Sequence, residues 1–429
     1  MNFEAALAYL YSLGHETLTL KLGLRTTELL LHSLGNPQHS YPAVQIAGTN
    51  GKGSTSVLLD SICNAAGIRA GLFTSPHLVS ITERIRICGA EISKELFAEL
   101  TTKVREHAES LVSVGTLAAA PTFFEQVTAI ALLAFAESNV ELAILETGLG
   151  GRLDSTTAVH AKTIGITPIA LDHQEYLGET IAEIAAEKAA VINEGATVVI
   201  APQEATAKDV LLGRCRFVGV TPQFAPAADI VSVDASGRVC ASFKSESDTY
   251  GNVNLGLRGR HQVTNAGVAV GLAEALRPKQ FKIDRAAIIK GLQQATHPGR
   301  LELISGQPNL LLDGAHNPAG AMALRAYLDE FVPGPLTIIF GAMREKNVRE
   351  MAATLFPGAD LLILTQPQNE RSASLDNLVE IANETINCRI VSERWSEAAL
   401  KLAREQTPSD GLICVTGSLY LVGEVRARL

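Results

Sequence analysis

The stretch AGTNGKGST, at residues 47–55, has the glycines, lysine and hydroxyl side chains of a phosphate-binding loop, but its spelling is unusual. In the common pattern G-x-x-x-x-G-K-[ST], the first glycine lies six residues before the lysine. Here that position is Ile46, and Lys52 is followed by Gly53 instead of a magnesium-binding hydroxyl. Backbone N–H groups from Asn50 to Ser54 are expected to face a triphosphate at the positive end of the next helix. The alternative is a tight turn with a solvated lysine.

Two further segments place polar residues where predicted strands end. Glu146 follows LAIL (142–145), a suitable position for a ligand of Mg²⁺, which uses one or two carboxylates with phosphate oxygens in nucleotide sites. Asp172 and His173 follow TIGITPIAL. A strand-end glutamate can equally be structural, and the histidine can equally be a hydrogen-bonding loop residue.

Lys188 is the most informative anomaly of the chain. It falls within an apolar helical stripe that contains Ile181, Ile184, Ala185 and Ile192. A lysine on a buried face is costly unless it is paired or neutral. It either extends to solvent or pairs with a buried acid, or it is a desolvated amine with a lowered pKa that is modified or used in the site.

Three more segments carry candidate residues. FTSPHL places Ser75 and His77 in a loop after a short strand, and PTFFEQ places Thr122 and Glu125 at the start of a buried helix. Phe123 and Phe124 are core aromatics or hold a flat ring. Beyond another strand, NLLLDGAHNPAG contains Asp313, His316 and Asn317.

The elements that would position these residues alternate along the chain. Short apolar runs at 43–46, 142–145, 163–167 and 197–201 are separated by amphipathic segments, which predicts βαβ units and a buried parallel sheet. Between Arg214 and Arg260, short alternating pieces predict an antiparallel excursion. A second α/β series has strands at 309–312, 336–340, 361–365 and 412–416, and we place the boundary near Pro298, giving domains 1–297 and 298–429. Ligands bind beyond the carboxyl ends of such strands.

Bulk properties narrow the class. The 429 residues exceed the size of a single core, and 47% hydrophobic with 19% charged residues is typical of a soluble globular protein. No basic, apolar leader and no apolar run of membrane-spanning length occurs, so we expect a cytoplasmic protein without membrane contact. The six scattered cysteines predict reduced thiols. A net charge of −9 without a dense basic run argues against nucleic acid.

Eight motifs in order give the chain a resemblance to a known family: AGTNGKGS, TSPHL, FFE, ETGLGGRLD, LDHQEYLGETIAEIAAEKA, GRHQVTNA, HPGRLE and LLLDGAHNPAG. The sequence resembles the bacterial folylpolyglutamate synthases and dihydrofolate synthases, a branch of the Mur ligase superfamily. That resemblance implies a P-loop-type, mostly parallel ATPase domain with a small antiparallel excursion, and a smaller Rossmann-like α/β C-terminal domain. It also implies ATP and two Mg²⁺ ions.

The resemblance assigns roles position by position. Catalytic roles would fall on Lys52, Lys188, His316 and Asp313, with Lys188 carbamylated and His316 on the glutamate side. The ATP contacts would be Asn50, Gly51, Lys52, Gly53, Ser54, Asn265, Arg300 and Asp313. The metal ligands would be Ser75, Glu146 and His173. The pterin-binding residues would be Leu22, Gly23, Leu24, Arg25, Thr122, Phe123, Phe124, Glu125, Arg152, Leu153 and Asp154.

The chain departs from the family pattern at Ala190, usually Gly, and at Ser155 and Thr157, usually Ala and Asn. The expected reaction is attack of a pterin-linked carboxylate on the γ-phosphate of ATP, followed by attack of L-glutamate on the acyl phosphate. Dihydropteroate, reduced folate or both remain open as acceptors, and a monomer is the expected state. The alternatives are a cell-wall Mur ligase, disfavoured because AGTNGKGS begins at residue 47, and a nucleotide-dependent switch without ligase activity.

Overall fold

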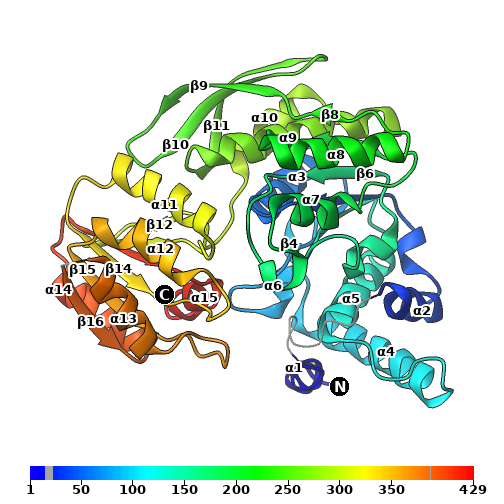
Figure 1. The fold of residues 1–429 in the computed structure, drawn as a ribbon. Coiled ribbons are helices and arrows are strands. Elements are labelled where there is room, and N and C mark those ends of the chain that lie inside the picture. The colour runs from blue at the N-terminus through cyan, green and yellow to red at the C-terminus, as the bar shows by residue number, and fades with distance from the viewer. Residues whose placement is uncertain (15–22, 387) are drawn as a thin grey trace.

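Two sheets with helices on both faces, and a small third sheet, make up the computed structural model, which describes residues 1–14, 23–386 and 388–429 (Figure 1). The first sheet has eight strands in the order β4-β3-β2-β5-β1-β6-β7-β8. Their bounds are β1 (Ala43–Ala47), β2 (Ala70–Phe73), β3 (Ile85–Ile87), β4 (Ala90–Glu91), β5 (Leu142–Glu146), β6 (Thr163–Ile166), β7 (Thr197–Ile200) and β8 (Gln223–Phe224).

The predicted parallel strands of this sheet are confirmed, because β1 pairs in parallel with both β5 and β6, and β6 pairs with β7. β1, β2 and β5 are buried at every residue, as expected for central strands covered on both faces. The sheet is not wholly parallel, since β3 and β4 add an antiparallel edge. This edge escaped prediction because each strand has only two or three residues.

Helices cover both faces of the first sheet. One apolar cluster joins α3 (Lys52–Ala65), α9 (His261–Leu276) and α10 (Arg285–Gln294) to the sheet, and two others lie on the opposite face. Those clusters contain α1 (Phe3–Ser12), α2 (Arg25–Ser33), α4 (Lys94–Ser113), α5 (Phe123–Glu137), α7 (Ile181–Ala189) and α8 (Ala205–Phe217). Shorter helices are α6 (Gln174–Leu177), η1 (Pro37–His39), η2 (Ile81–Arg84), η3 (Ser155–Val159) and η4 (Arg277–Lys279).

The apolar stripe around Lys188 was predicted to extend to Ile192, but α7 ends at Ala189. Ile192 is fully buried beyond the helix, so burial and not helical continuity explains its apolar character.

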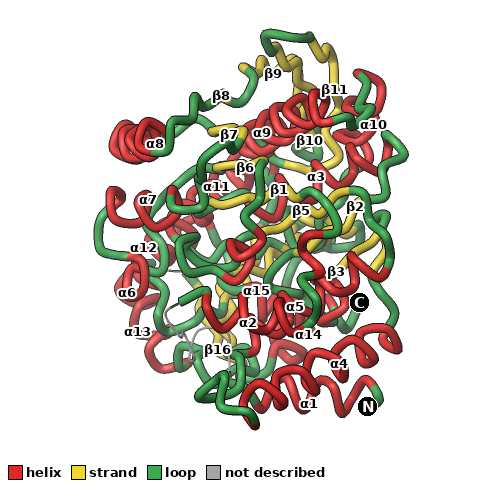
Figure 2. Tube along the Cα trace, turned by 90° about the vertical axis from the view of Figure 1, so that its right-hand side faces the viewer, coloured by secondary structure: helices red, strands yellow, loops and turns green. Residues whose placement is uncertain are grey.

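The predicted antiparallel excursion is confirmed as a three-stranded sheet in the order β11-β10-β9. Its strands are β9 (Ala227–Val233), β10 (Arg238–Lys244) and β11 (Thr249–Arg258). Its inward-facing side chains, among them Phe243 and Tyr250, share a core with α9 and α10. The views in Figures 1 and 2 agree in placing this sheet at the opposite end of the molecule from α1 and α4.

The C-terminal sheet has six strands in the order β12-β13-β17-β14-β15-β16, parallel except for β12 with β13. The strands are β12 (Glu302–Ile304), β13 (Asn309–Leu312), β14 (Leu336–Phe340), β15 (Leu361–Thr365), β16 (Arg389–Glu393) and β17 (Leu412–Thr416). One face packs against α11 (Pro318–Phe331), α12 (Val348–Leu355), η5 (Phe356–Gly358) and α13 (Leu375–Thr385), and the other against α14 (Ser396–Gln406) and α15 (Leu419–Arg426).

The four central strands of this second sheet match the predicted runs, whereas β12 and β16 were missed. Both are edge strands with partly exposed side chains, so neither has a continuous apolar signature. Among the helices of the described residues, none has the length and apolarity needed to cross a membrane.

Candidate active site

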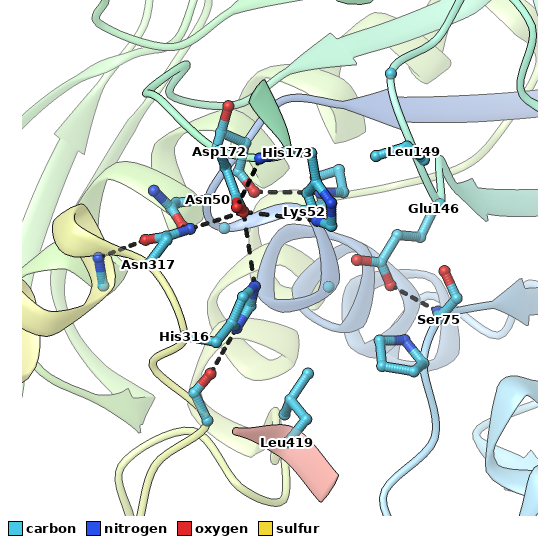
Figure 3. Close-up of a pocket in the computed structure, with 18 of the residues that line it drawn as sticks. Asn50, Lys52, Ser75, Glu146, Leu149, Asp172, His173, His316, Asn317 and Leu419 are labelled. Atoms are coloured by element: carbon cyan, nitrogen blue, oxygen red, sulfur yellow. Dashed lines mark hydrogen bonds and ion pairs between the residues drawn. The ribbon is translucent and has the colours of Figure 1, made fainter. Parts of the chain in front are cut away.

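A cavity of about 830 Å³ lies where the carboxyl ends of β1, β2, β5 and β6 face the loop after β13. Its lining comes from both α/β portions of the chain, and Figure 3 shows several of these side chains converging on it. The predicted residues that line it are Gly23, Asn50, Gly51, Lys52, Gly53, Ser54, Ser75, Thr122, Phe124, Glu125, Glu146, Arg152, Leu153, Asp154, His173, Lys188, Asn265, Arg300, Asp313 and His316. The structure therefore gathers most of the predicted residues at one place.

The stretch that resembles a phosphate-binding loop, residues 47–55, joins β1 to the start of α3. Gly51 has φ +86°, and a Cβ there would lie 2.1 Å from Asn265 Oδ1, so glycine is required on two grounds. The first intrahelical bond runs from the Thr55 N–H to the Gly51 carbonyl at 2.9 Å, and Gly51 provides no side-chain cap. The N–H groups of residues 52–54 are thus left at the positive end of α3.

One expectation for this loop is wrong. The Asn50 N–H was expected to face a triphosphate, but it donates to the Pro168 carbonyl at 3.2 Å, and the Thr49 N–H donates to the same oxygen at 3.0 Å. The loop is therefore anchored to the segment after β6 by its first amides, and the Asn50 side chain contacts another element instead.

Lys52 and Glu146 interact electrostatically on the N-terminal side of the cavity. Burial lowers the pKa of the Lys52 amine, against the attraction of the Glu146 and Asp172 carboxylates, and the amine donates to the Thr49 carbonyl at 3.2 Å. Burial raises the pKa of the Glu146 carboxyl, opposed mainly by Lys52.

Glu146 Oε2 accepts the Ser75 backbone N–H at 3.1 Å, so Ser75 and Glu146 lie together as predicted. A Cβ on Gly53 would lie 3.3 Å from both carboxylate oxygens, so the absence of a side chain there leaves the carboxylate facing the loop. A buried carboxylate beside a lysine and an open helix N-terminus is a donor set that fits a divalent cation bound with phosphate.

Asp172 is the centre of a polar cluster that joins the two α/β portions. Its Oδ1 accepts from Lys346 Nζ at 2.6 Å and its Oδ2 accepts from Asn317 Nδ2 at 3.0 Å. Burial works against ionisation of Asp172, but Lys346, His173 and His316 together hold its pKa well below the usual range. The carboxylate is therefore charged, and it connects the segment after β6 to Lys346 and Asn317 of the C-terminal portion.

His173 belongs to this cluster and not to the Glu146 group. Its Nε2 accepts from Lys346 Nζ at 3.0 Å, and burial, with the Lys346 charge, lowers its pKa to about 3. Within residues 1–14, 23–386 and 388–429, no three His, Cys, Asp or Glu side chains are grouped closely enough to hold a metal ion. Of the predicted ligands, Ser75 is therefore bonded to Glu146, whereas His173 is bonded to Lys346.

The loop after β13 presents His316 and Asn317 to this cluster. His316 Nδ1–H donates to the Gly314 carbonyl at 2.8 Å, which leaves Nε2 facing the cavity, 3.8 Å from Asp172 Oδ2. Burial lowers the pKa of His316 to about 4. Asn317 caps α11 through its Oδ1, and its Nδ2 also donates to Asn50 Oδ1 at 3.0 Å.

Asp313 and Arg300 support that loop. The Asp313 carboxylate accepts the N–H groups of Leu301 at 2.9 Å and Ala315 at 3.0 Å, while Arg300 Nη1 donates to the Gly314 carbonyl at 3.2 Å. Burial raises the pKa of Asp313, and Arg300 opposes that shift. Both side chains line the cavity, and both also fix the backbone that carries His316.

Lys188 is only 4% exposed and lines the cavity from α7. Burial, with the nearby charge of Lys52, lowers its pKa from 10.5 to about 7, against the attraction of Asp172 and Asp154. Of the alternatives left open by the sequence, extension to solvent is excluded by this burial. The amine is available in its neutral, nucleophilic form near pH 7.

The predicted pterin-binding residues divide into two groups. Thr122 and Glu125 form a capping box at the start of α5 and also line the cavity with Phe124. Phe123 does not line it: its ring stacks on Tyr11 at 5.8 Å, with the Arg84 guanidinium 5.4 Å from its centroid. Leu24 and Arg25 likewise lie outside the lining, and Leu22 lies outside the described residues.

Several lining residues were not predicted. Lys346 lies six residues beyond the end of β14, where the rule that polar residues after parallel strands line a site could have found it. Gln262 donates to Ser54 Oγ at 3.3 Å and accepts from Asn265 Nδ2 at 2.8 Å. It lies in GRHQVTNA, one of the eight motifs, but only Asn265 of that motif was given a role.

Comparisons with known proteins agree with this geometry. Residues 46–273 match the Mur ligase middle domain, and residues 299–419 match the Mur ligase glutamate ligase domain. The chain is 35% identical over 422 residues to a dihydrofolate synthase/folylpolyglutamate synthase of Bacillus subtilis, covering 96% of this chain and 95% of that protein. It is 38% identical over 419 residues to a probable bifunctional folylpolyglutamate synthase/dihydropteroate synthase of Halobacterium salinarum, covering 95% of this chain but about half (49%) of that longer protein.

Solved structures give the same result. A folylpolyglutamate synthase of Mycobacterium tuberculosis, complexed with ADP and AMPPCP, superposes with a TM-score of 0.91 at 30% identity, covering 100% of this chain and 99% of that one. A bifunctional folylpolyglutamate synthase/dihydrofolate synthase with Mn, AMPPNP and L-glutamate bound superposes with a TM-score of 0.84 at 29% identity, covering 100% and 98% of the two chains.

Proposed function

The chain belongs to the Mur ligase family, among its folylpolyglutamate synthase and dihydrofolate synthase members, and we propose that it joins L-glutamate to the carboxylate of dihydropteroate, reduced folates or both, using ATP. One observation carries the proposal. The open N-terminus of α3 and Lys52 share a single cavity with His316 and Lys346 of the C-terminal portion. A nucleotide switch needs only the phosphate loop, whereas a ligase must bring a third reactant to the same phosphate.

In the proposed reaction, the N–H groups of residues 52–54 and the Lys52 amine hold the β- and γ-phosphates, with Asn265, Arg300 and Asp313 on the rest of the nucleotide. The acceptor enters beside Phe124 and the loop 149–154, and its carboxylate attacks the γ-phosphate, breaking the bond to the β,γ-bridging oxygen, so that ADP leaves and an acyl phosphate forms. The amine of L-glutamate, oriented from the His316 side, then attacks the acyl carbon, and phosphate leaves as the amide forms.

The cation that fits beside Glu146 is proposed to be Mg²⁺, and a second Mg²⁺ ion is proposed as well. His173 and Ser75 are the further proposed ligands of these ions. A divalent ion, when bound, neutralises charge on the transferring phosphoryl group. The carbamate proposed on Lys188 would add a negative charge to the cavity lining near Lys52. Water must be kept from the acyl phosphate, which it would hydrolyse.

Three wider statements belong to the same proposal. Residues 1–297 and 298–429 act as an ATP-binding domain and a glutamate-ligase domain, the protein is monomeric, and it works in the cytoplasm with small-molecule substrates only. The six cysteines, all unpaired, support a reducing compartment.

ADP release by the purified protein tests the reaction. Reactions with ATP, Mg²⁺ and L-glutamate are compared without acceptor, with dihydropteroate, with tetrahydrofolate and with a UDP-linked cell-wall precursor. Stimulation by a pterin, lost when L-glutamate is omitted and lost in Lys52→Met, is expected. Stimulation by the UDP-linked precursor alone would favour the cell-wall ligase, and ADP release that ignores every acceptor would favour the switch.

A further inference from the structure

A partly buried hydroxyl holds the backbone of the loop that lines the acceptor side of the cavity. Thr157 Oγ1, in η3, donates to the Gly151 carbonyl at 2.7 Å. The same oxygen accepts from Gln45 Nε2 at 2.8 Å. Gln45 is 1% exposed and lies in the middle of β1, the strand whose carboxyl end leads into the phosphate loop.

The Gln45 amide is a junction for three hydroxyl groups. Besides Thr157, its Nε2 lies 3.0 Å from Thr156 Oγ1 and 3.2 Å from Thr147 Oγ1. Thr156 Oγ1 in turn donates to Asp154 Oδ1 at 2.5 Å, and Asp154 Oδ2 accepts the Leu149 N–H at 2.9 Å. Both ends of the loop 149–154 are therefore connected to β1 through hydroxyl groups below the cavity.

The other side of this loop is pressed against α7 and the residues after it. A Cβ on Gly151 would lie 2.8 Å from the Glu187 carbonyl and 2.8 Å from Val191 Cγ1, and the Arg152 N–H donates to that same carbonyl at 3.0 Å. Gly151 is thus held between the α7 backbone and the Thr157 hydroxyl. The loop is thus bonded on one side to α7 and on the other, through Thr157 and Gln45, to β1.

We propose that Thr157 is a positioning residue for the acceptor. Through its bonds to Gly151 and Gln45 it holds the loop 149–154 in the position in which the acceptor carboxylate reaches the γ-phosphate of ATP. This inference rests on the proposed function for its kinetic consequence, but not for its structural one. Thr157 does not itself line the cavity, so it acts through the Gly151 carbonyl.

The test compares Thr157→Val, which keeps the shape and removes the hydroxyl, with Thr157→Ser, which keeps the hydroxyl. Thr337→Val is the control, because Thr337 Oγ1 shares a hydrogen bond of the same length, 2.7 Å, with the hydroxyl of Thr407 in the C-terminal portion. Amide hydrogen exchange of the peptide covering 149–154 is measured without ligands. Steady-state KM values for ATP and acceptor are measured with the full chain.

Thr157→Val is expected to speed exchange in the 149–154 peptide and to raise the acceptor KM about three- to tenfold, the effect of losing one hydrogen bond. The KM for ATP should stay within about twofold, since residues 52–54 are not moved. Thr157→Ser should resemble the parent protein, and Thr337→Val should change neither reading. Unchanged exchange in Thr157→Val overturns the inference whether or not the protein is a ligase, and so does an equal rise in both KM values. Absence of pterin-dependent turnover in the parent protein, with faster exchange in Thr157→Val, overturns the proposed function only.

Discussion

Replacing Lys188 by methionine should stabilise the protein in buffer free of CO₂, and the gain should shrink as the pH rises. The folded pKa of about 7 lies below the ordinary 10.5, so the protonated amine is disfavoured by folding. This penalty is fully present below pH 7 and disappears as the pH approaches 10.5, where the unfolded chain also loses the proton. A difference of 3.5 pKa units gives a penalty of at most about 4 kcal/mol at pH 7 and about 2 kcal/mol at pH 9.

The same shift makes Lys188 reactive toward CO₂. At pH 7 about half of a population with a pKa of about 7 is neutral, against about one molecule in 3,000 for a pKa of 10.5. Bicarbonate should therefore stabilise the parent protein at pH 7 and not Lys188→Met. With ¹³C-bicarbonate, the parent alone should show a carbamate carbon resonance.

Urea unfolding followed by circular dichroism, at pH 7 and pH 9 with and without bicarbonate, measures these free energies of unfolding. Lys279→Met is the control. Lys279 Nζ donates to the Lys162 carbonyl and Thr163 Oγ1, each at 2.7 Å, so its loss should destabilise the protein. A Lys188→Met variant that is less stable than the parent in CO₂-free buffer, or whose advantage grows with pH, would refute the reasoning.

Two other substitutions test the site. The Lys346 and Asp172 side chains are only 8% and 7% exposed, and Lys346→Met leaves the buried Asp172 carboxylate without the cation that lies 2.6 Å away. The kcat of this variant should therefore fall at least about tenfold. In the control, Arg260→Met breaks an exposed pair with Glu330, and its kcat should fall by less than about twofold. Equal losses in the two variants would argue against a role for the buried pair. Gly51→Ala adds a Cβ 2.1 Å from Asn265 Oδ1 and should raise the KM for ATP at least about tenfold. Gly67 has a similar φ of +73°, but a Cβ there would have no other atom within 4 Å, so Gly67→Ala should change only stability. An unaltered KM for ATP in Gly51→Ala would contradict the proposed position of the nucleotide.

The sequence predicted those parts of the fold and site that leave a local pattern. Central strands such as β1 and β5 are buried on both faces, so they appear as apolar runs, and Glu146 is placed by its strand alone. The buried face of α7 identified Lys188 in the same way. These predictions depend on short-range periodicity, which tertiary structure rarely overrides in fully buried elements.

The rest depends on contacts between distant segments. Lys346 meets Asp172 across 174 positions of sequence, and nothing local to either residue indicates the other. Phe123 and Phe124 are adjacent and chemically identical, yet one is held between Tyr11 and Arg84 while the other lines the cavity. Which of two neighbours faces a site is decided by the rotation of the helix against its partners, and that rotation is a tertiary property.

The unusual spelling of the phosphate loop now has a physical reason. A side chain at Gly53 would begin 3.3 Å from both oxygens of Glu146 and 3.0 Å from His297 Cε1, so His297 and the carboxylate from the neighbouring strand crowd the place of the usual hydroxyl. The next hydroxyl, on Ser54, interacts with Gln262 and His297. In the proposed site, Glu146 of β5 takes the place of the hydroxyl that the loop usually supplies, and glycine after Lys52 leaves room for its carboxylate.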